Sequence, residues 1–198
     1  HEELRPFACN REQEAGLVGV EIGMADNYYD QIQEAAAFLK KHFKVEPRVG
    51  AVLGSGLGAY GDALTNAVKI PYKEIPHFPV GSVHGHAGTL VAGTTRGTPC
   101  VVMSGRAHLY EGYTAREAVF PIRVLGALGI KFLVVTNAAG GISTPLNPGD
   151  MMLIEDHINL LGDNPLLGPN DDRLGPRFLD MTDAYSPRHV VKVQQGVN

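Results

Sequence analysis

The stretch "SGRAHLYEGY", residues 104–113, carries the side chains best suited to chemistry in this 198-residue chain. Arg106 offers a planar guanidinium that matches the oxygens of a phosphate. In an extended chain His108 and Tyr110 fall on the same side as Arg106. Glu111 can hydrogen-bond a histidine and fix its tautomer. The spacing indicates an anion site, although a charged surface loop would equally account for Arg106 alone.

A second candidate is "GSGLGA", residues 54–59, which follows the apolar run Val49–Leu53. Glycines let backbone N–H groups approach an anion, and Ser55 adds a hydroxyl, so a phosphate cradle is favoured. The same letters match the dinucleotide fingerprint G-x-G-x-x-G/A, with Glu74 about 20 residues further on. The segment "KEIPHFP" around Glu74 contains two prolines and does not resemble the end of a strand, which weakens the dinucleotide interpretation. A plain tight turn is the third possibility.

Two further motifs bear on the same chemistry. In "VTNAAGG", residues 135–141, the backbone N–H of Ala138 can donate to an anion, unless the segment is a simple turn. His84, His86 and His108 together would suit zinc. However, no acidic or cysteine ligand stands near them in sequence, and Arg106 would repel a cation. We therefore expect an anion site and no metal.

These candidates must be positioned by strands and helices of an α/β fold. Buried strands are predicted at 49–53, 89–94, 100–104 and 131–136, with another within 149–160. Helices are predicted at 28–43, at 116–129 with a disturbance at Pro121, and from Pro187 onward after Ser186 as N-cap. Polar or glycine-rich stretches follow three of the strands. Because ligands gather at the carboxyl ends of strands, we expect these stretches to converge on one site.

The composition limits the partners. Hydrophobic content is 44% and the formal net charge is −4, so neither nucleic acid nor an anionic membrane is indicated. No apolar stretch approaches the roughly 18 residues of a membrane span, and the N-terminus does not resemble a signal peptide. Cys9 and Cys100 are interpreted as reduced thiols. We expect a cytoplasmic protein, with residues 1–23 as an N-terminal extension or arm and residues 24–198 as the N-terminal two-thirds of one domain.

Taken together, these motifs resemble the trimeric purine nucleoside phosphorylase family. The matching pieces occur in family order and are "LGSGLG", "HGHAG", "GRAHLYEGY", "VTNAAGG", "GDMMLIEDHINL" and "GPNDDRLGPRF". The resemblance implies a phosphorylase-type α/β fold with a central mixed twisted sheet flanked by helices, and a homotrimer. It also implies phosphorolysis of purine (deoxy)ribonucleosides to free base and (deoxy)ribose 1-phosphate. Inorganic phosphate would be the co-substrate, and no other cofactor is implied.

The resemblance also implies residue roles. Phosphate would be bound by Ser55, Arg106, His108 and the backbone N–H of Ala138. His86 would lie beside the phosphate and the ribose 5′ end, Tyr110 against the ribose, and Glu111 would orient His108. Catalytic work would fall to His108, Glu111 and His86.

The chain departs from the family pattern in two places. Leu174 in "NDDRLG" stands where the family commonly has an aromatic residue that reaches a neighbouring subunit's sugar site. The family's C-terminal third, with its purine-binding residues, has no counterpart before Asn198, so base-binding residues and base preference are not predicted. We expect sheet edges and apolar faces to be uncovered as a result.

Two alternatives to a purine nucleoside phosphorylase stay open. One is a truncated chain that binds phosphate without turnover. The other is a methylthioadenosine phosphorylase. His86 favours a free 5′-hydroxyl over a 5′-methylthio group, because a polar ring suits a hydroxyl better.

Overall fold

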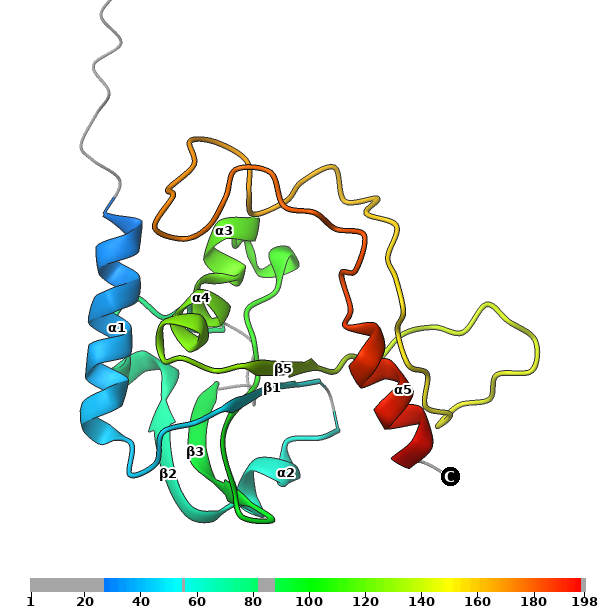
Figure 1. Ribbon diagram of the computed structural model, residues 1–198, viewed down its shortest axis with the longest axis horizontal. Coiled ribbons are helices and arrows are strands. Elements are labelled where there is room, and N and C mark those ends of the chain that lie inside the picture. The colour runs from blue at the N-terminus through cyan, green and yellow to red at the C-terminus, as the bar shows by residue number, and fades with distance from the viewer. Residues whose placement is uncertain (1–26, 55, 82–87, 197–198) are drawn as a thin grey trace, which may run out of the picture.

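A five-stranded mixed sheet forms the centre of the computed structural model, which describes residues 27–54, 56–81 and 88–196 (Figure 1). The strands are β1 Val49–Leu53, β2 Thr65–Pro71, β3 Thr89–Thr95, β4 Thr98–Ser104 and β5 Phe132–Val135. Their order across the sheet is β2-β3-β4-β1-β5. β1 pairs in parallel with β4 and β5, whereas β3 is antiparallel to both β2 and β4. The expected mixed α/β sheet is confirmed.

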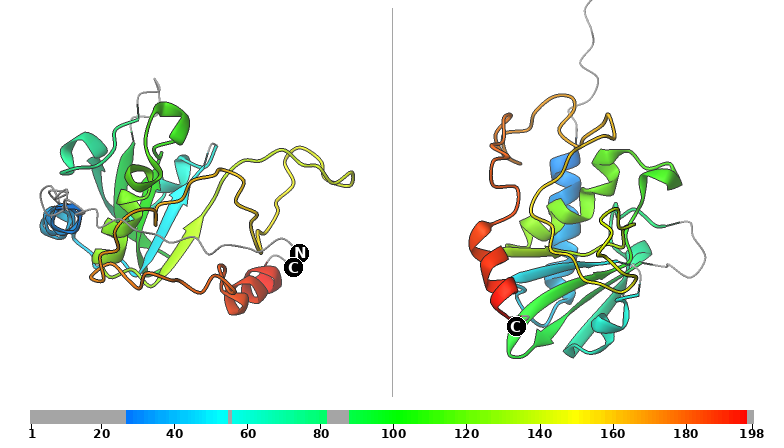
Figure 2. Two further views of the ribbon diagram at one scale, coloured as in Figure 1. Left: turned by 90° about the horizontal axis from the view of Figure 1, so that it is seen from above. Right: turned by 90° about the vertical axis from the view of Figure 1, so that its right-hand side faces the viewer.

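Helices precede, connect and follow the strands. They are α1 Tyr28–His42, α2 Ala59–Asp62, α3 Ala115–Ala118, α4 Phe120–Ala127 and α5 Pro187–Gly196, with 3-10 turns η1 Tyr72–Glu74 and η2 Leu109–Glu111. α1 and α4 lie on the same face (Figures 1 and 2), where Ile32, Leu39 and Leu125 are fully buried against the sheet residues Val101 and Met103. This is the larger core, and it fixes the sheet from which the candidate loops leave.

The helix predictions are confirmed. α1 buries one face at helical spacing, and α5 begins at Pro187 as expected, with the Ser186 carbonyl accepting its first backbone hydrogen bonds. The predicted break near Pro121 separates α3 from α4, because proline lacks an N–H and is tolerated in the first turn of a helix. Gly129, at φ 89°, follows the end of α4.

One strand was missed and one predicted strand is wrong. β2 pairs with β3 at the sheet edge, although the sequence 65–71 shows only a short apolar pattern. The strand predicted within 149–160 is not formed; that segment is irregular and mostly exposed. A strand needs a neighbour for its backbone groups, and no described segment pairs with it. Residues 136–186 instead leave the sheet beyond β5 and return past α3 before α5 begins (Figure 1).

The second face of the sheet is covered less completely. Leu53, Leu64, Val91, Cys100 and Val102 form a smaller core there. The β5 side chains Phe132–Val135 are between 41% and 55% exposed, in line with the expectation of an uncovered edge. Among the described helices none has the length and apolar character needed to cross a membrane.

Candidate functional site

The carboxyl ends of β1, β4 and β5 lie side by side. Leu53 is in register with Ser104, and Val52 with Val135, in parallel pairs. The loops that follow these strands therefore leave the same edge of the sheet. The predicted convergence of the three motifs is confirmed for their described residues.

Thr136 joins the loops after β1 and β5. Its hydroxyl accepts a hydrogen bond from the Gly54 N–H at 2.8 Å and donates one to the Val52 carbonyl at 3.0 Å. A Cβ atom at Gly54 would lie 2.9 Å from the Thr136 carbonyl oxygen and 3.0 Å from the Asn137 Cα. Both are backbone atoms, so only glycine fits this approach. "VTNAAGG" contains Thr136, but its spacing did not reveal this role.

Arg106 lies between the same two strand ends. Its Nη1 atom is 3.4 Å from the carbonyl oxygen of Leu53 and 3.4 Å from that of Thr136. The guanidinium is half-buried and, among the residues that the structure describes, makes no ion pair. A cation fixed in place without a carboxylate partner suits an incoming anion.

Tyr72 supports the loop that carries Arg106, and no motif or spacing in the sequence indicated this role. Its hydroxyl donates to the Gly105 carbonyl at 2.8 Å, and its side chain is only 2% exposed. Its ring occupies the space where a Cβ at Gly88 would stand, 2.1 Å from a ring carbon. Burial raises the pKa of the Tyr72 phenol, which therefore stays a donor at neutral pH.

The predicted contact between Glu111 and His108 is present. The His108 Nδ1 atom lies 2.9 Å from Glu111 Oε1, which also accepts the His108 backbone N–H at 3.1 Å. The Glu111 side chain is 3% exposed, whereas that of His108 is 35% exposed. A carboxylate accepts only, so Nδ1 carries the hydrogen and Nε2 is the ring atom left for a ligand.

Tyr110 reaches His108 by a different route from the one expected. The chain is not extended beyond His108, because Leu109–Glu111 is the 3-10 turn η2, which a capping box between His108 and Glu111 stabilises. The Tyr110 ring nevertheless stacks on the His108 ring, with centroids 4.8 Å apart and planes at 19°. Tyr110 is 77% exposed, so its outer face is open to solvent.

The remaining predicted residues are placed only in part. Ser55, His84 and His86 lie outside the described residues. Ala138 follows β5 at the converging edge and is exposed, and its N–H has no hydrogen-bond partner within the described chain. Its place fits a donor to an anion, and its role stays a prediction.

The dinucleotide interpretation is wrong for this topology. In that fold the strand leading to the acidic residue neighbours the first strand. Here β3 and β4 separate β2 from β1, so Glu74, in η1 after β2, belongs to the far side of the sheet. The helix that follows the loop, α2, has only four residues, too few for the long helix whose N-terminus binds the pyrophosphate in that fold. Of the three histidines considered as zinc ligands, His84 and His86 lie outside the described residues, so the expectation of no metal stays a prediction.

Leu174 packs within its own chain. It is partly buried against the larger core, and its N–H donates to the Asp171 carbonyl at 2.8 Å. That Leu174 takes the place of the family's aromatic residue beside a neighbouring subunit's sugar site stays a prediction.

Comparisons with known proteins agree with this fold. Residues 48–198 match the Phosphorylase superfamily. The chain is 55% identical over 157 residues to purine nucleoside phosphorylase 1 of Geobacillus stearothermophilus, covering 79% of this chain and 57% of that protein. It is 51% identical over 160 residues to purine nucleoside phosphorylase of Rattus norvegicus, covering 79% and 55%. The chain therefore belongs to the purine nucleoside phosphorylase family.

Solved structures agree with this assignment. A purine nucleoside phosphorylase in complex with ribose-1-phosphate superposes with a TM-score of 0.79 at 41% identity, over 85% of this chain and 63% of the other. The Schistosoma mansoni enzyme in complex with inosine gives a TM-score of 0.78 at 39% identity, over 85% and 61%. The chain thus spans less than two thirds of the length of these relatives.

Proposed function

We propose that this chain provides the phosphate and ribose side of a purine nucleoside phosphorylase. The reaction is the phosphorolysis of purine (deoxy)ribonucleosides to free base and (deoxy)ribose 1-phosphate. One observation carries the proposal: Arg106 is held between the ends of β1 and β5 without a carboxylate partner among the described residues. The relatives that bear the name of this enzyme support it.

The residues divide the work by their chemistry. The Arg106 guanidinium and the Ala138 N–H bind phosphate, and His108, oriented by Glu111, offers Nε2 to the same anion. Ser55 and His86 complete the phosphate site, with His86 also near the ribose 5′ end. Tyr110 lies against the ribose. Neither a protein nucleophile nor a metal takes part.

The reaction balances without an intermediate on the protein. A phosphate oxygen forms a bond to C1′ while the C1′–N9 bond breaks, and its electron pair leaves with the purine, which takes up a proton. Positive charge develops on the sugar, as in glycoside cleavage. A phosphate dianion held next to C1′ stabilises that charge and is also the nucleophile.

Incubating the protein with inosine, with and without phosphate, tests the proposal. Phosphorolysis predicts equal amounts of hypoxanthine and ribose 1-phosphate, and only when phosphate is present. Arsenate should replace phosphate and yield free ribose. Release of base without phosphate would mean hydrolysis and would contradict the proposal. A better rate with methylthioadenosine than with inosine would instead favour a methylthioadenosine phosphorylase.

A second candidate is phosphate binding without turnover. It is favoured by the open ribose side of the site, where Tyr110 is 77% exposed and, within the described chain, stacks on His108 alone. Calorimetry separates the two functions, because this candidate predicts a phosphate binding isotherm together with no cleavage of inosine.

The family resemblance also supports a homotrimer. Sedimentation velocity should then give the mass of three copies, and the mass of one copy at all concentrations would contradict this assembly.

A further inference from the structure

The carboxyl end of β2 lies at the same edge of the sheet as the carboxyl ends of β1, β4 and β5. The last residue of β2, Pro71, is in register with Thr89 of β3, which is in register with Ser104, the last residue of β4. Tyr72 therefore stands one residue beyond this row, and β3 separates it from the loop after β4. Neighbouring strands are about 4.8 Å apart, so only a long side chain can reach across two strand spacings.

The Tyr72 side chain makes this crossing. Its backbone N–H donates to the Gly88 carbonyl at 2.9 Å, which extends the contact between β2 and β3 by one residue. Its hydroxyl donates to the Gly105 carbonyl, in the loop after β4, at 2.8 Å. A Cβ at Gly88 would lie 2.1 Å from the Tyr72 ring, so a glycine is needed there for the ring to pass. One residue thus connects the ends of three neighbouring strands, directly before Arg106.

The Tyr72 ring is held firmly by the larger core. It is buried and packs edge-on against the ring of Phe78, with centroids 5.3 Å apart. Phe78 packs in turn against Phe120 at 6.0 Å, and all three residues belong to this core. Because close-packed aromatic rings have little freedom to move, the Tyr72 hydroxyl stays in one place. It therefore fixes the Gly105 carbonyl relative to the core.

The contacts of Arg106 with the other strand ends are long. Its Nη1 atom lies 3.4 Å from the carbonyl oxygens of Leu53 and Thr136, which is more than a typical hydrogen bond. The preceding residue, Gly105, has φ 98°, and glycine has many other backbone conformations open to it. A further contact is therefore needed to keep the Arg106 backbone in this direction, and the Tyr72 hydroxyl supplies it.

We propose that Tyr72 is a positioning residue for phosphate binding: it holds the peptide before Arg106 and so keeps the guanidinium directed at the anion. The inference rests on the proposed function, because it takes Arg106 as the phosphate-binding cation. Tyr72 acts through Arg106 and not by contact with the anion. Without its hydroxyl the loop leaves the binding position for part of the time. The apparent phosphate affinity then falls with the fraction of molecules that keep Arg106 in place.

Tyr72→Phe tests the proposal, because it keeps the ring and removes only the hydroxyl. Calorimetric titration with inorganic phosphate should show an affinity about three- to tenfold lower than that of the unaltered chain, since one neutral hydrogen bond is lost. Equal phosphate affinity in the two proteins would overturn the proposal.

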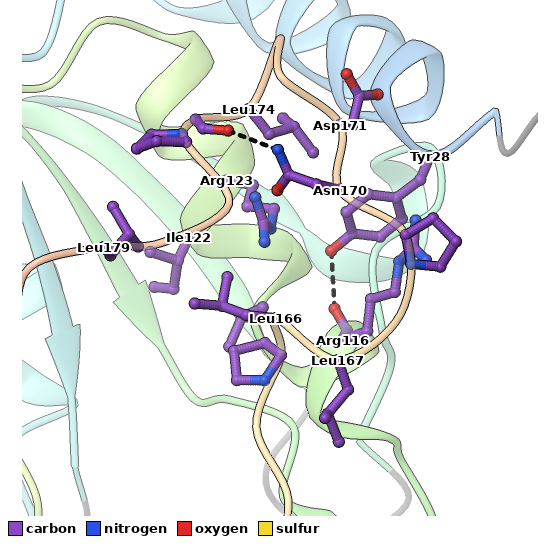
Figure 3. A pocket seen from close by; sticks show the side chains of 15 residues that line it. Tyr28, Arg116, Ile122, Arg123, Leu166, Leu167, Asn170, Asp171, Leu174 and Leu179 are labelled. Atoms are coloured by element: carbon purple, nitrogen blue, oxygen red, sulfur yellow. Dashed lines mark hydrogen bonds between the residues drawn. The ribbon is translucent and has the colours of Figure 1, made fainter.

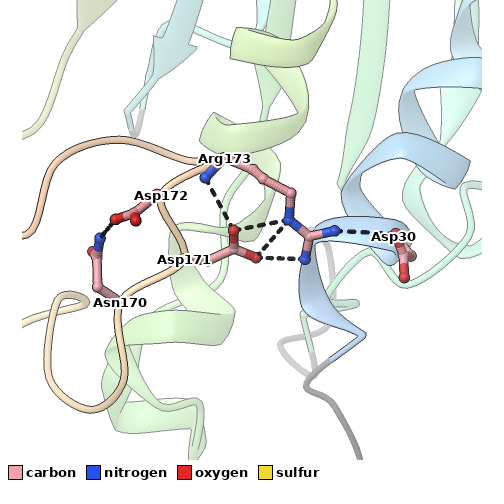
Figure 4. A network of polar contacts seen from close by, with 5 residues as sticks. All are labelled: Asp30, Asn170, Asp171, Asp172 and Arg173. Atoms are coloured by element: carbon pink, nitrogen blue, oxygen red, sulfur yellow. Dashed lines mark hydrogen bonds and ion pairs between the residues drawn. The ribbon is translucent and has the colours of Figure 1, made fainter.

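Tyr28→Phe is the matched control. Tyr28 is a second buried tyrosine of the larger core, and its hydroxyl donates to the Arg116 carbonyl, also at 2.8 Å (Figure 3). It lies at the start of α1, where the Arg173 guanidinium is 3.8 Å from Asp30, so the hydroxyl is not the sole tie of this helix end (Figure 4). The variant should lose stability much as Tyr72→Phe does and should bind phosphate as the unaltered chain does. An equal loss of phosphate affinity in both variants would indicate a general effect of the core and would contradict a positioning role.

A double variant shows whether Tyr72 acts through Arg106. In Arg106→Met the group to be positioned is gone, so adding Tyr72→Phe should lower phosphate affinity no further. NMR titration with inorganic phosphate measures such weak binding. If the losses of the two single variants multiply in the double variant, Tyr72 acts independently of Arg106 and the proposal is wrong.

The proposed function and the positioning role fail in different ways. No phosphate binding by the unaltered chain would refute the phosphate site itself. Phosphate binding that is unchanged in Tyr72→Phe would refute the positioning role alone. The side-chain Nε–H signal of Arg106 in NMR spectra, assigned with Arg106→Met, tests the positioning without any ligand. It should shift or broaden in Tyr72→Phe and stay in place in Tyr28→Phe, and a signal unmoved in Tyr72→Phe would overturn the proposal.

Discussion

The Glu111 carboxylate accepts hydrogen bonds from both the ring and the backbone of His108: Oε1 lies 2.9 Å from Nδ1 and 3.1 Å from the backbone nitrogen. One nearly buried carboxylate oxygen therefore sets the tautomer of the ring and the start of η2 together. The residue that orients His108 is also part of the local fold, and the two roles can be separated by substitution.

Glu111→Gln should affect the site more than the fold. The amide oxygen still accepts both N–H groups, but without charge assistance, so phosphate affinity should fall about three- to tenfold. Glu111→Ala removes the acceptor and should also lower the free energy of unfolding, by about 1 kcal/mol or more. Calorimetry with phosphate and thermal unfolding check the two effects. Equal phosphate affinity in all three proteins would refute a role for Glu111 in orienting His108.

Gly54→Ala tests the close approach of the loops after β1 and β5. The new Cβ would stand 2.9 Å from a backbone oxygen, so we expect a loss of about 1–3 kcal/mol in the free energy of unfolding. Gly58→Ala is the control: it has φ −54° and nothing within 4 Å of an added Cβ. That variant should unfold at the same denaturant concentration or slightly higher. If the two variants are equally stable, Gly54 is not tightly packed.

Thr136→Val keeps the shape of the side chain and removes its hydroxyl. The Gly54 N–H then loses its acceptor, which should cost about 1–2 kcal/mol of stability. Phosphate affinity should fall with it, because Arg106 contacts the Thr136 carbonyl. Thr136→Ser retains the hydroxyl and should bind phosphate nearly as the unaltered chain does. A serine variant as weak as the valine variant would show that the methyl group, and not the hydrogen bonds, matters.

Tyr72→Phe removes the hydrogen bond to the Gly105 carbonyl, at an expected cost of about 1 kcal/mol. It should also change the pH dependence of stability. Burial raises the pKa of Tyr72 in the folded state, whereas an unfolded tyrosine ionises near pH 10. The unfolded state then binds fewer protons above about pH 10, so stability falls there as pH rises.

Urea unfolding at several alkaline pH values measures this dependence. The fall should be shallower in Tyr72→Phe and should not vanish, because burial also raises the pKa of Tyr28. If the free energy of unfolding falls equally in both proteins at alkaline pH, burial of the Tyr72 phenol is contradicted.

Local patterns predicted much of this fold. The helical spacing of α1, the proline at the start of α4 and of α5, and the apolar runs of β1, β3, β4 and β5 all carry their signal within a few residues. β2 was missed because its apolar residues are few and its pairing with β3 decides its structure. The strand predicted within 149–160 had the apolar pattern, but pairing depends on a neighbour that a local pattern does not reveal.

In the site, too, contacts between residues close in sequence were predicted, and contacts between distant residues were missed. "SGRAHLYEGY" predicted the His108–Glu111 contact because the partners are three residues apart. The supports of the Arg106 loop come from a distance: Tyr72 is 33 residues from Gly105, and Thr136 is 82 residues from Gly54. Such contacts follow from the strand order, which brings β1, β4 and β5 together, and no spacing in the sequence encodes them.

Calorimetric titration of inorganic phosphate into the chain and into Arg106→Met shows whether Arg106 binds the phosphate. We expect a saturable isotherm in the unaltered chain and an affinity about 10- to 100-fold lower in the variant, since charge-assisted hydrogen bonds are each worth about 1.5–3 kcal/mol. Arg188→Met, the exposed control, should leave the isotherm unchanged. Equal phosphate binding in the unaltered chain and Arg106→Met would show that the converging strand ends are not the phosphate site.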